Sequence, residues 1–159
     1  MKRKVILFLW LLVIAIAVMI FLFSAQDGAA SSRTSGFFTN WLIHLLYPDY
    51  DAWPKADQNA MFTRMHGIVR KGAHFTEFAM LGGALRLLFA AIRLPSPFWW
   101  AWAAGTLYAC TDELHQKFVG YRAATLGDVC IDSAGVLTMV CLVSLILLIR
   151  RKRKAGGTA

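Results

Sequence analysis

Hydrophobic residues are concentrated in four long runs, and the segments between the runs carry most of the polar residues. The runs cover residues 5–23, 74–92, 98–116 and 126–149. An α-helix rises about 1.5 Å per residue, so about 20 residues cross the roughly 30 Å hydrocarbon layer of a bilayer. The pattern therefore predicts four transmembrane helices, and we expect an all-α, polytopic membrane protein built as a four-helix bundle.

The first run is expected to be a retained helix rather than a cleaved signal peptide. No charged residue occurs from Val5 to Phe23, whereas the apolar region of a signal peptide is only about 7–15 residues long. The sequence Phe23-Ser24-Ala25 is also a poor cleavage site. The whole chain, residues 1–159, is therefore expected to form a single membrane domain.

The segment between the first two runs, residues 24–73, has a helical pattern of its own. Apolar residues recur at helical spacing after two candidate N-caps, Ser32 and Ser35; they are Phe37, Phe38, Trp41, Leu42, Leu45 and Leu46. We expect an amphipathic helix in the membrane interface, a turn-rich break at residues 47–54, and a second short helix at residues 55–70. The segment is either a lid over the bundle or a simple interfacial anchor.

Composition agrees with a membrane protein. Of the 159 residues, 58% are hydrophobic and 16% are charged, against a charged fraction of about 25% in soluble domains. The mean hydropathy is +0.53. The net charge of +8 does not indicate nucleic-acid binding, because it is concentrated at the chain ends, notably in Arg150–Lys154. A basic tail directly after an apolar helix is a topology signal beside anionic lipids.

The basic residues also predict the orientation. With four spans, the basic N-terminus, Arg93 and the basic tail all lie on one side. Loops and ends rich in lysine and arginine remain in the cytoplasm, so we expect both termini to be cytoplasmic and residues 24–73 to be extracytoplasmic. The three cysteines lie in apolar segments without a C-x-x-C motif, and their odd number argues against a disulfide framework.

With this topology, all nine carboxylates and all four histidines fall in outer loops or in the outer ends of the spans. Ionisable side chains in a span are costly and must face one another or a wet cavity. Three sets share a helix face by their spacing: Arg70, His74 and Glu77; Asp112, His115 and Gln116; Asp128 and Asp132. These residues form either a closed ion-pair network or a functional pocket, and we favour the pocket because a network that served stability alone would rarely take on this desolvation cost.

The residue types suggest roles within such a pocket. Candidate acid–base groups are Glu77, His74, Asp112, Glu113, His115, Asp128 and Asp132. Candidate substrate-binding groups are Ser24, Gln26, Asp27, Arg70, Lys71, Gln116 and Arg122. The cofactor is left open, since His74-x-x-Glu77 and Asp112-x-x-His115 are pairs that could hold a divalent metal but that are common in proteins.

The sequence resembles the VanZ-like family of bacterial membrane proteins. The resemblance rests on an ordered set of segments: Phe23-Ser-Ala-Gln-Asp-Gly28, Arg70-Lys-Gly-Ala-His-Phe-Thr-Glu-Phe78, Thr111-Asp-Glu-Leu-His-Gln-Lys-Phe118, Arg122, and Gly127-Asp-Val-Cys-Ile-Asp-Ser-Ala-Gly135. It implies a small protein of the bacterial cytoplasmic membrane. The founding member is tied to resistance against teicoplanin, a lipidated glycopeptide antibiotic, so the resemblance also implies a role in the cell envelope.

Three functions are consistent with these residues. The first is an enzyme that acts on an amphiphilic or lipid-linked envelope molecule at the outer leaflet. The second is a non-catalytic protein that binds or gates a lipid or a lipidated antibiotic there. The third, ion or proton movement, is disfavoured because the inner half of the bundle offers only Arg86, Thr138 and Ser144 as polar groups.

Overall fold

The computed structural model describes residues 2–26, 28–118 and 125–156, and every regular element in them is helical. The elements, in chain order, are α1 (Lys2–Ser24), α2 (Gly28–Leu46), the short 3-10 helix η1 (Tyr50–Ala52), α3 (Lys55–Ala91), α4 (Pro97–Gln116) and α5 (Leu126–Gly156). The predicted all-α class is confirmed.

The four expected spans coincide with helices, but one of these begins much earlier than predicted. The helix expected over residues 74–92 is the second part of α3, which starts at Lys55. The separate short helix expected at residues 55–70 is therefore wrong. No proline interrupts residues 55–91, and isolated glycines such as Gly67 and Gly72 weaken a helix without ending it, so one helix of 37 residues forms.

Two other predicted boundaries change. The helix expected to begin after Ser32 or Ser35 begins at Gly28, so both serines lie inside α2 and are not its N-caps. The last helix continues beyond residue 149 to Gly156, because arginine and lysine are good helix formers. A tight turn joins α3 and α4, and in it Arg93 and Ser96 adopt positive φ angles of 60° and 49°.

Two of the described helices are long and apolar enough to cross a membrane by length and composition alone, over Arg3–Ser24 in α1 and Leu126–Lys154 in α5. The expected spans in α3 and α4 mix ionisable and apolar residues, so four spans do not follow from composition alone. Large hydrophobic side chains are exposed along α1 and α5, among them Leu7 and Phe8 on α1 and Leu145 and Leu148 on α5.

The second part of α3 is the centre of the bundle and packs against α1, α4 and α5. Its Phe78 is fully buried, as are Ile20 of α1, Ala101 of α4 and Val136 of α5. Glycines allow the helices to approach closely: a Cβ at Gly82 would lie 2.7 Å from the backbone oxygen of Val136. Small residues at helix contacts are typical of membrane bundles.

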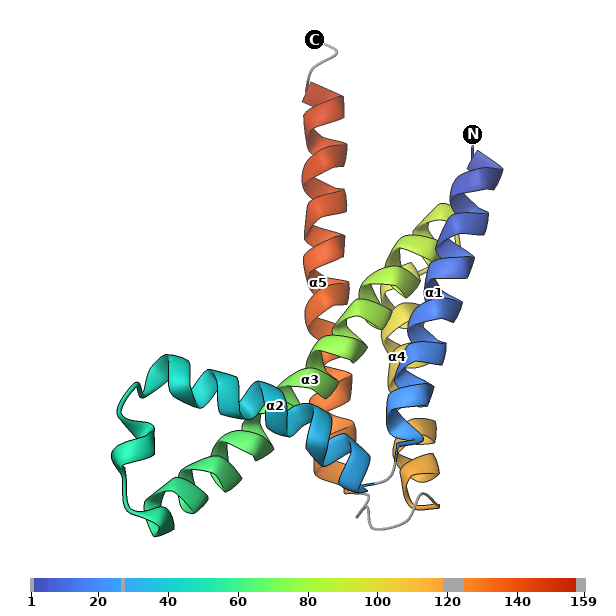
Figure 1. Ribbon diagram of the computed structural model, residues 1–159. Coiled ribbons are helices and arrows are strands. Elements are labelled where there is room, and N and C mark those ends of the chain that lie inside the picture. Colours follow the sequence, from blue (N-terminus) through green and yellow to red (C-terminus); the bar gives the residue numbers. More distant parts are fainter. Residues whose placement is uncertain (1, 27, 119–124, 157–159) are drawn as a thin grey trace.

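Helix α2, η1 and residues 55–73 of α3 form an arm, which projects to one side of the bundle in Figure 1. The free ends of α1 and α5 lie at one end of the molecule, and α2 begins and α4 ends at the opposite end.

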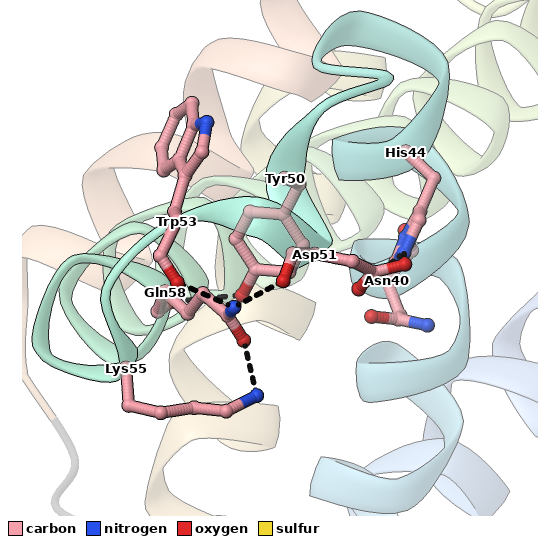
Figure 2. Close-up of polar contacts among 7 residues, drawn as sticks. All are labelled: Asn40, His44, Tyr50, Asp51, Trp53, Lys55 and Gln58. Atoms are coloured by element: carbon pink, nitrogen blue, oxygen red, sulfur yellow. Dashed lines mark hydrogen bonds and ion pairs between the residues drawn. The ribbon is translucent and has the colours of Figure 1, made fainter.

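The tip of the arm is held by the buried Gln58, whose amide donates to the backbone oxygens of Asp51 (3.2 Å) and Trp53 (2.9 Å), as Figure 2 shows. The Tyr50 hydroxyl donates to the backbone oxygen of Gln58 at 2.8 Å.

Candidate functional site

Three polar side chains from α1 and α4 form a buried hydrogen-bonded cluster at the end of the bundle away from the chain termini. The Ser24 hydroxyl donates to the Asp112 carboxylate at 2.7 Å. The Gln116 amide donates to the same carboxylate oxygen at 2.9 Å and to the Ser24 hydroxyl at 3.1 Å. All three side chains are buried. Asp112 and Gln116 share the helix face that their spacing predicts, and Ser24 joins them from the last turn of α1.

Two further carboxylates, Glu113 and Asp128, hold the start of α5. The Thr125 hydroxyl accepts from the backbone N–H of Asp128 at 3.1 Å and donates to the Asp128 carboxylate at 2.9 Å. This is an N-cap with a reciprocal contact to the third residue of the helix. The backbone N–H of Thr125 donates in turn to the buried Glu113 carboxylate at 2.7 Å. Glu113 and Asp128 thus position α5 relative to α4.

Asp132 differs from these carboxylates. Its side chain is only 1% exposed, and neither carboxylate oxygen has a hydrogen-bond partner among the described residues. Four other carboxylates lie within electrostatic range of it, Glu77, Asp112, Glu113 and Asp128. These five residues are called the acidic cluster below. The residues come from α3, α4 and α5, so the structure gathers around one point the acidic groups that the sequence placed at similar depth.

Glu77 connects the acidic cluster to a groove between the arm and the bundle. The groove has a volume of about 430 Å³, which lies within the usual range of about 300–1,000 Å³ for ligand pockets. We call it the α2–α3 groove, and its lining is Phe38, Trp41, Leu42, Val69, Gly72, Ala73, Thr76 and Glu77. The walls are almost entirely apolar, and Glu77 is the charged group among them. The sequence did not predict this groove, because its two walls are far apart in the chain.

The two histidines predicted in the site lie near it in different surroundings. His115 stacks on Phe21 of α1 with ring centroids 4.7 Å apart, and its buried Nδ1 has no hydrogen-bond partner in the described part of the chain. His74 is half-buried on α3, one helical turn before Glu77. His44 and His66, which the sequence placed on the same side of the membrane, both belong to the arm.

The remaining candidates are less enclosed or fall outside the described residues. Arg70 and Lys71 are exposed on α3, and Gln26 is half-buried after the end of α1. Asp27 and Arg122 lie outside the described residues. Within residues 2–26, 28–118 and 125–156, no three histidine, cysteine or acidic side chains are placed to hold one metal ion.

The arm contains two polar contacts that sequence reasoning missed. His66 lies 2.7 Å from the Ser35 hydroxyl and stacks on Phe62, which fastens α2 to α3. At the tip, His44 contacts the Asn40 backbone oxygen at 2.8 Å and the Asp51 carboxylate at 3.3 Å (Figure 2). The hydrogen bond to Asn40, followed by the contact with Asp51, raises the pKa of His44 above its usual value. Only the i, i+4 spacing of Asn40 and His44 was visible in the sequence.

Comparison with curated proteins and with solved structures gives no match. A family model described as VanZ/LLP1 matches residues 8–148, which include all five members of the acidic cluster and both walls of the α2–α3 groove. The match extends over nearly the whole chain and agrees with the resemblance that the ordered motifs indicated. The chain therefore belongs to the VanZ/LLP1 family.

Proposed function

We propose that this chain is a multi-pass protein of the bacterial cytoplasmic membrane that binds an amphiphilic envelope molecule at the extracytoplasmic face. The observation that carries the proposal is the continuity of two unlike surfaces: an apolar groove of about 430 Å³ meets the acidic cluster at Glu77. Such a site fits a ligand with one apolar and one polar part. A helix bundle that served only as a lipid anchor would have no use for an acidic cluster beside an apolar groove.

Four spans and two cytoplasmic termini are part of this proposal. Helix α4 has 20 residues, long enough at about 1.5 Å per residue to cross the hydrocarbon layer, and α3 from residue 74 onward runs beside it (Figure 1). The basic ends of α1 and α5 lie at the end of the molecule opposite the start of α2, which supports placing the acidic cluster on the outer side.

Topology is tested with alkaline phosphatase fusions, since this reporter is active only outside the cytoplasm. A fusion after Pro48, in the arm, is expected to be active, whereas fusions after Arg93 and after Lys154 are expected to be inactive. An inactive Pro48 fusion that is expressed as well as the others would place the site in the cytoplasm and contradict an outer-leaflet function.

Binding is tested by the lipids and lipidated molecules that copurify with the protein. Gly72 lines the groove, and a Cβ there would meet nothing within 4 Å, so Gly72→Leu fills the groove without displacing backbone. Gly67 on the same helix has equally open surroundings but is not part of the groove lining. We expect Gly72→Leu to lose the copurified ligand and Gly67→Leu to keep it; identical retention in both variants would exclude the groove as the binding site.

Catalysis is the second candidate, with Glu77, Asp132 and His115 as its reactive groups. Asp112 and Asp128 are engaged by neighbouring hydroxyl and amide donors, which suits a positioning role. In a susceptible bacterium that expresses the protein, teicoplanin susceptibility and envelope lipid composition are the readouts. If Glu77→Gln, Asp132→Asn and His115→Ala all fold and retain the wild-type phenotype, the catalytic interpretation is excluded and binding alone is left.

A further inference from the structure

We propose that the α2–α3 groove opens sideways into the bilayer and takes up an acyl chain of a membrane lipid directly from the outer leaflet. One face of α2 lies in the same leaflet. This inference rests on the proposed binding function and adds the class of the ligand, a bilayer lipid rather than an amphiphile dissolved in water.

The first observation is the apolar surface of α2. Phe37, Trp41 and Leu45 recur at a spacing of four residues and are 70%, 60% and 61% exposed; we call them the exposed α2 face. Thr39 and Ile43, on the opposite side of the helix, are fully buried. Residues 36–46 contain no aspartate, glutamate, lysine or arginine. Soluble proteins rarely expose large apolar side chains together in this way, so the exposed α2 face is suited to lipid.

The other helix of the arm has the opposite character. The first part of α3 packs against α2, and its exposed residues include Lys55, Asp57, Asn59 and Arg64. The arm projects to one side of the bundle (Figure 1). An element with one apolar and one polar side is typical of the membrane interface. We therefore place the exposed α2 face in lipid and the polar residues of α3 towards water.

The second observation is that the groove is open at the surface of the arm. Phe38 and Trp41 line it on the α2 side and are 56% and 60% exposed. Gly72, Ala73 and Thr76 line it on the α3 side and are exposed as well. A ligand therefore enters the groove from the medium that surrounds α2. Because the exposed α2 face lies in lipid, that medium is the bilayer.

The third observation is a stripe of exposed residues that leads from the groove along α3. Thr76, Met80 and Leu87 share one side of the helix by their spacing, and Met80 and Leu87 are 41% and 38% exposed. The Thr76 hydroxyl donates to the backbone oxygen of Gly72 at 2.8 Å, so its polar group is satisfied within the helix. From Thr76 to Leu87 the helix rises about 17 Å, close to one leaflet of the roughly 30 Å hydrocarbon layer. An acyl chain can therefore pass from the leaflet into the groove without leaving apolar surroundings.

Photolabelling from the bilayer and from water tests this inference. The full-length protein is reconstituted in phosphatidylcholine vesicles that contain a small fraction of phosphatidylcholine with a diazirine in the middle of one acyl chain. A second sample, in plain phosphatidylcholine, receives a small charged diazirine that stays in water. Irradiation attaches each probe to the side chains it contacts, and mass spectrometry of peptides locates the labels.

We expect the lipid probe to label the exposed α2 face at Phe37, the stripe at Met80 and the half-buried groove wall at Val69. The water probe should label the polar residues 55–64 of α3 and none of these three. Gly72→Leu fills the groove and should abolish lipid labelling of Val69 while leaving that of Phe37 and Met80 unchanged. Gly67→Leu, the matched control outside the groove lining, should leave all three labels intact.

The outcomes separate this inference from the proposed function. Lipid labelling of Phe37 and Met80 without Val69, or labelling of Val69 by the water probe, would overturn the sideways opening. Absence of both labels from Phe37 would mean that a protein, such as a second copy of this chain, covers the exposed α2 face, and would overturn its place in lipid. These results leave amphiphile binding in place as long as Gly72→Leu loses the copurified ligand. Equal ligand retention in Gly72→Leu and Gly67→Leu would refute the proposed function whatever the labelling shows.

Discussion

Replacing Gly135 by alanine tests the helix contact that sets the shape of the acidic cluster. A Cβ at Gly135 would collide with the backbone oxygen of Phe75 on α3. Phe75 and Glu77 belong to the same turn of α3, and Asp132 and Gly135 belong to the same turn of α5. The contact therefore helps to fix the separation between Glu77 and Asp132, two members of the acidic cluster.

The size of the effect follows from which atom the new methyl group meets. Inserting a methyl group into a packed contact costs typically about 1–3 kcal/mol, and a rigid backbone atom as the neighbour places Gly135→Ala towards the upper end. Alanine recovers about 1 kcal/mol of helix propensity. We expect a net loss of about 1–2 kcal/mol in the free energy of unfolding, equivalent to roughly a 5–30-fold change in the equilibrium.

Two glycines of α3, Gly83 and Gly72, provide graded controls. A Cβ at Gly83 would lie 2.7 Å from Cγ of Met139, a side-chain atom that can shift more easily than backbone, so Gly83→Ala is expected to cost less stability than Gly135→Ala. A Cβ at Gly72 meets nothing within 4 Å, so Gly72→Ala is expected to stabilise by about 0.5–1 kcal/mol. Unfolding in mixed micelles with an increasing fraction of SDS, followed by circular dichroism, gives the three values. If Gly135→Ala proves as stable as Gly72→Ala, α3 and α5 do not pack as closely as described, and the burial of Asp132 is wrong.

Three further predictions concern the contacts around the site and the arm. Thr125→Ala removes the side-chain cap of α5 and should lower the free energy of unfolding in the same micelle assay by about 1 kcal/mol, whereas Thr125→Ser should restore most of it. Ser24→Ala leaves the buried Asp112 carboxylate without one of its donors and should lower the free energy of unfolding by about 1–3 kcal/mol. A change below about 0.5 kcal/mol, the level of a surface substitution, would contradict the buried hydrogen-bonded cluster. Because the pKa of His44 is raised in the folded arm, its contribution to arm stability is fully present below the unfolded pKa of about 6.5 and is lost as the pH rises through the folded value. Amide exchange at the arm tip should therefore accelerate over that pH interval in the wild type, and Asp51→Asn should weaken this dependence.

The sequence predicted the helices of the bundle well because hydrophobic runs of this length have few structural alternatives. It missed the continuity of α3, since two amphipathic stretches with different faces can belong to one helix when no residue breaks it. Lys55–Arg70 presents its apolar residues to α2, whereas residues 74–91 present theirs to three helices. The spacing of apolar residues indicates which side of each stretch is buried. It does not indicate whether the two stretches form one continuous helix.

The candidate site was predictable within each helix and not between helices. Spacing placed Asp112 and Gln116 on one face, and the structure joins them by a hydrogen bond of 2.9 Å. Spacing gave no indication that Ser24 donates to the same carboxylate, or that Glu113 binds the backbone of Thr125. Such partners depend on helix registers that only tertiary packing determines. For this reason the sequence alone assigned all five carboxylates of the acidic cluster to one class of acid–base candidates.

Separating these carboxylates by their partners changes what the acidic cluster can do. Asp112, Glu113 and Asp128 bind groups on neighbouring helices or at the start of α5, so their substitution is expected to affect folding and function together. Asp132 is held in place by the helix packing around Gly135 rather than by hydrogen bonds among the described residues. Four other carboxylates lie within electrostatic range of Asp132, and the helix packing keeps its side chain from water. Asp132→Asn is therefore the substitution that should best separate function from stability, because it keeps the size and shape of the side chain and breaks no hydrogen bond among the described residues.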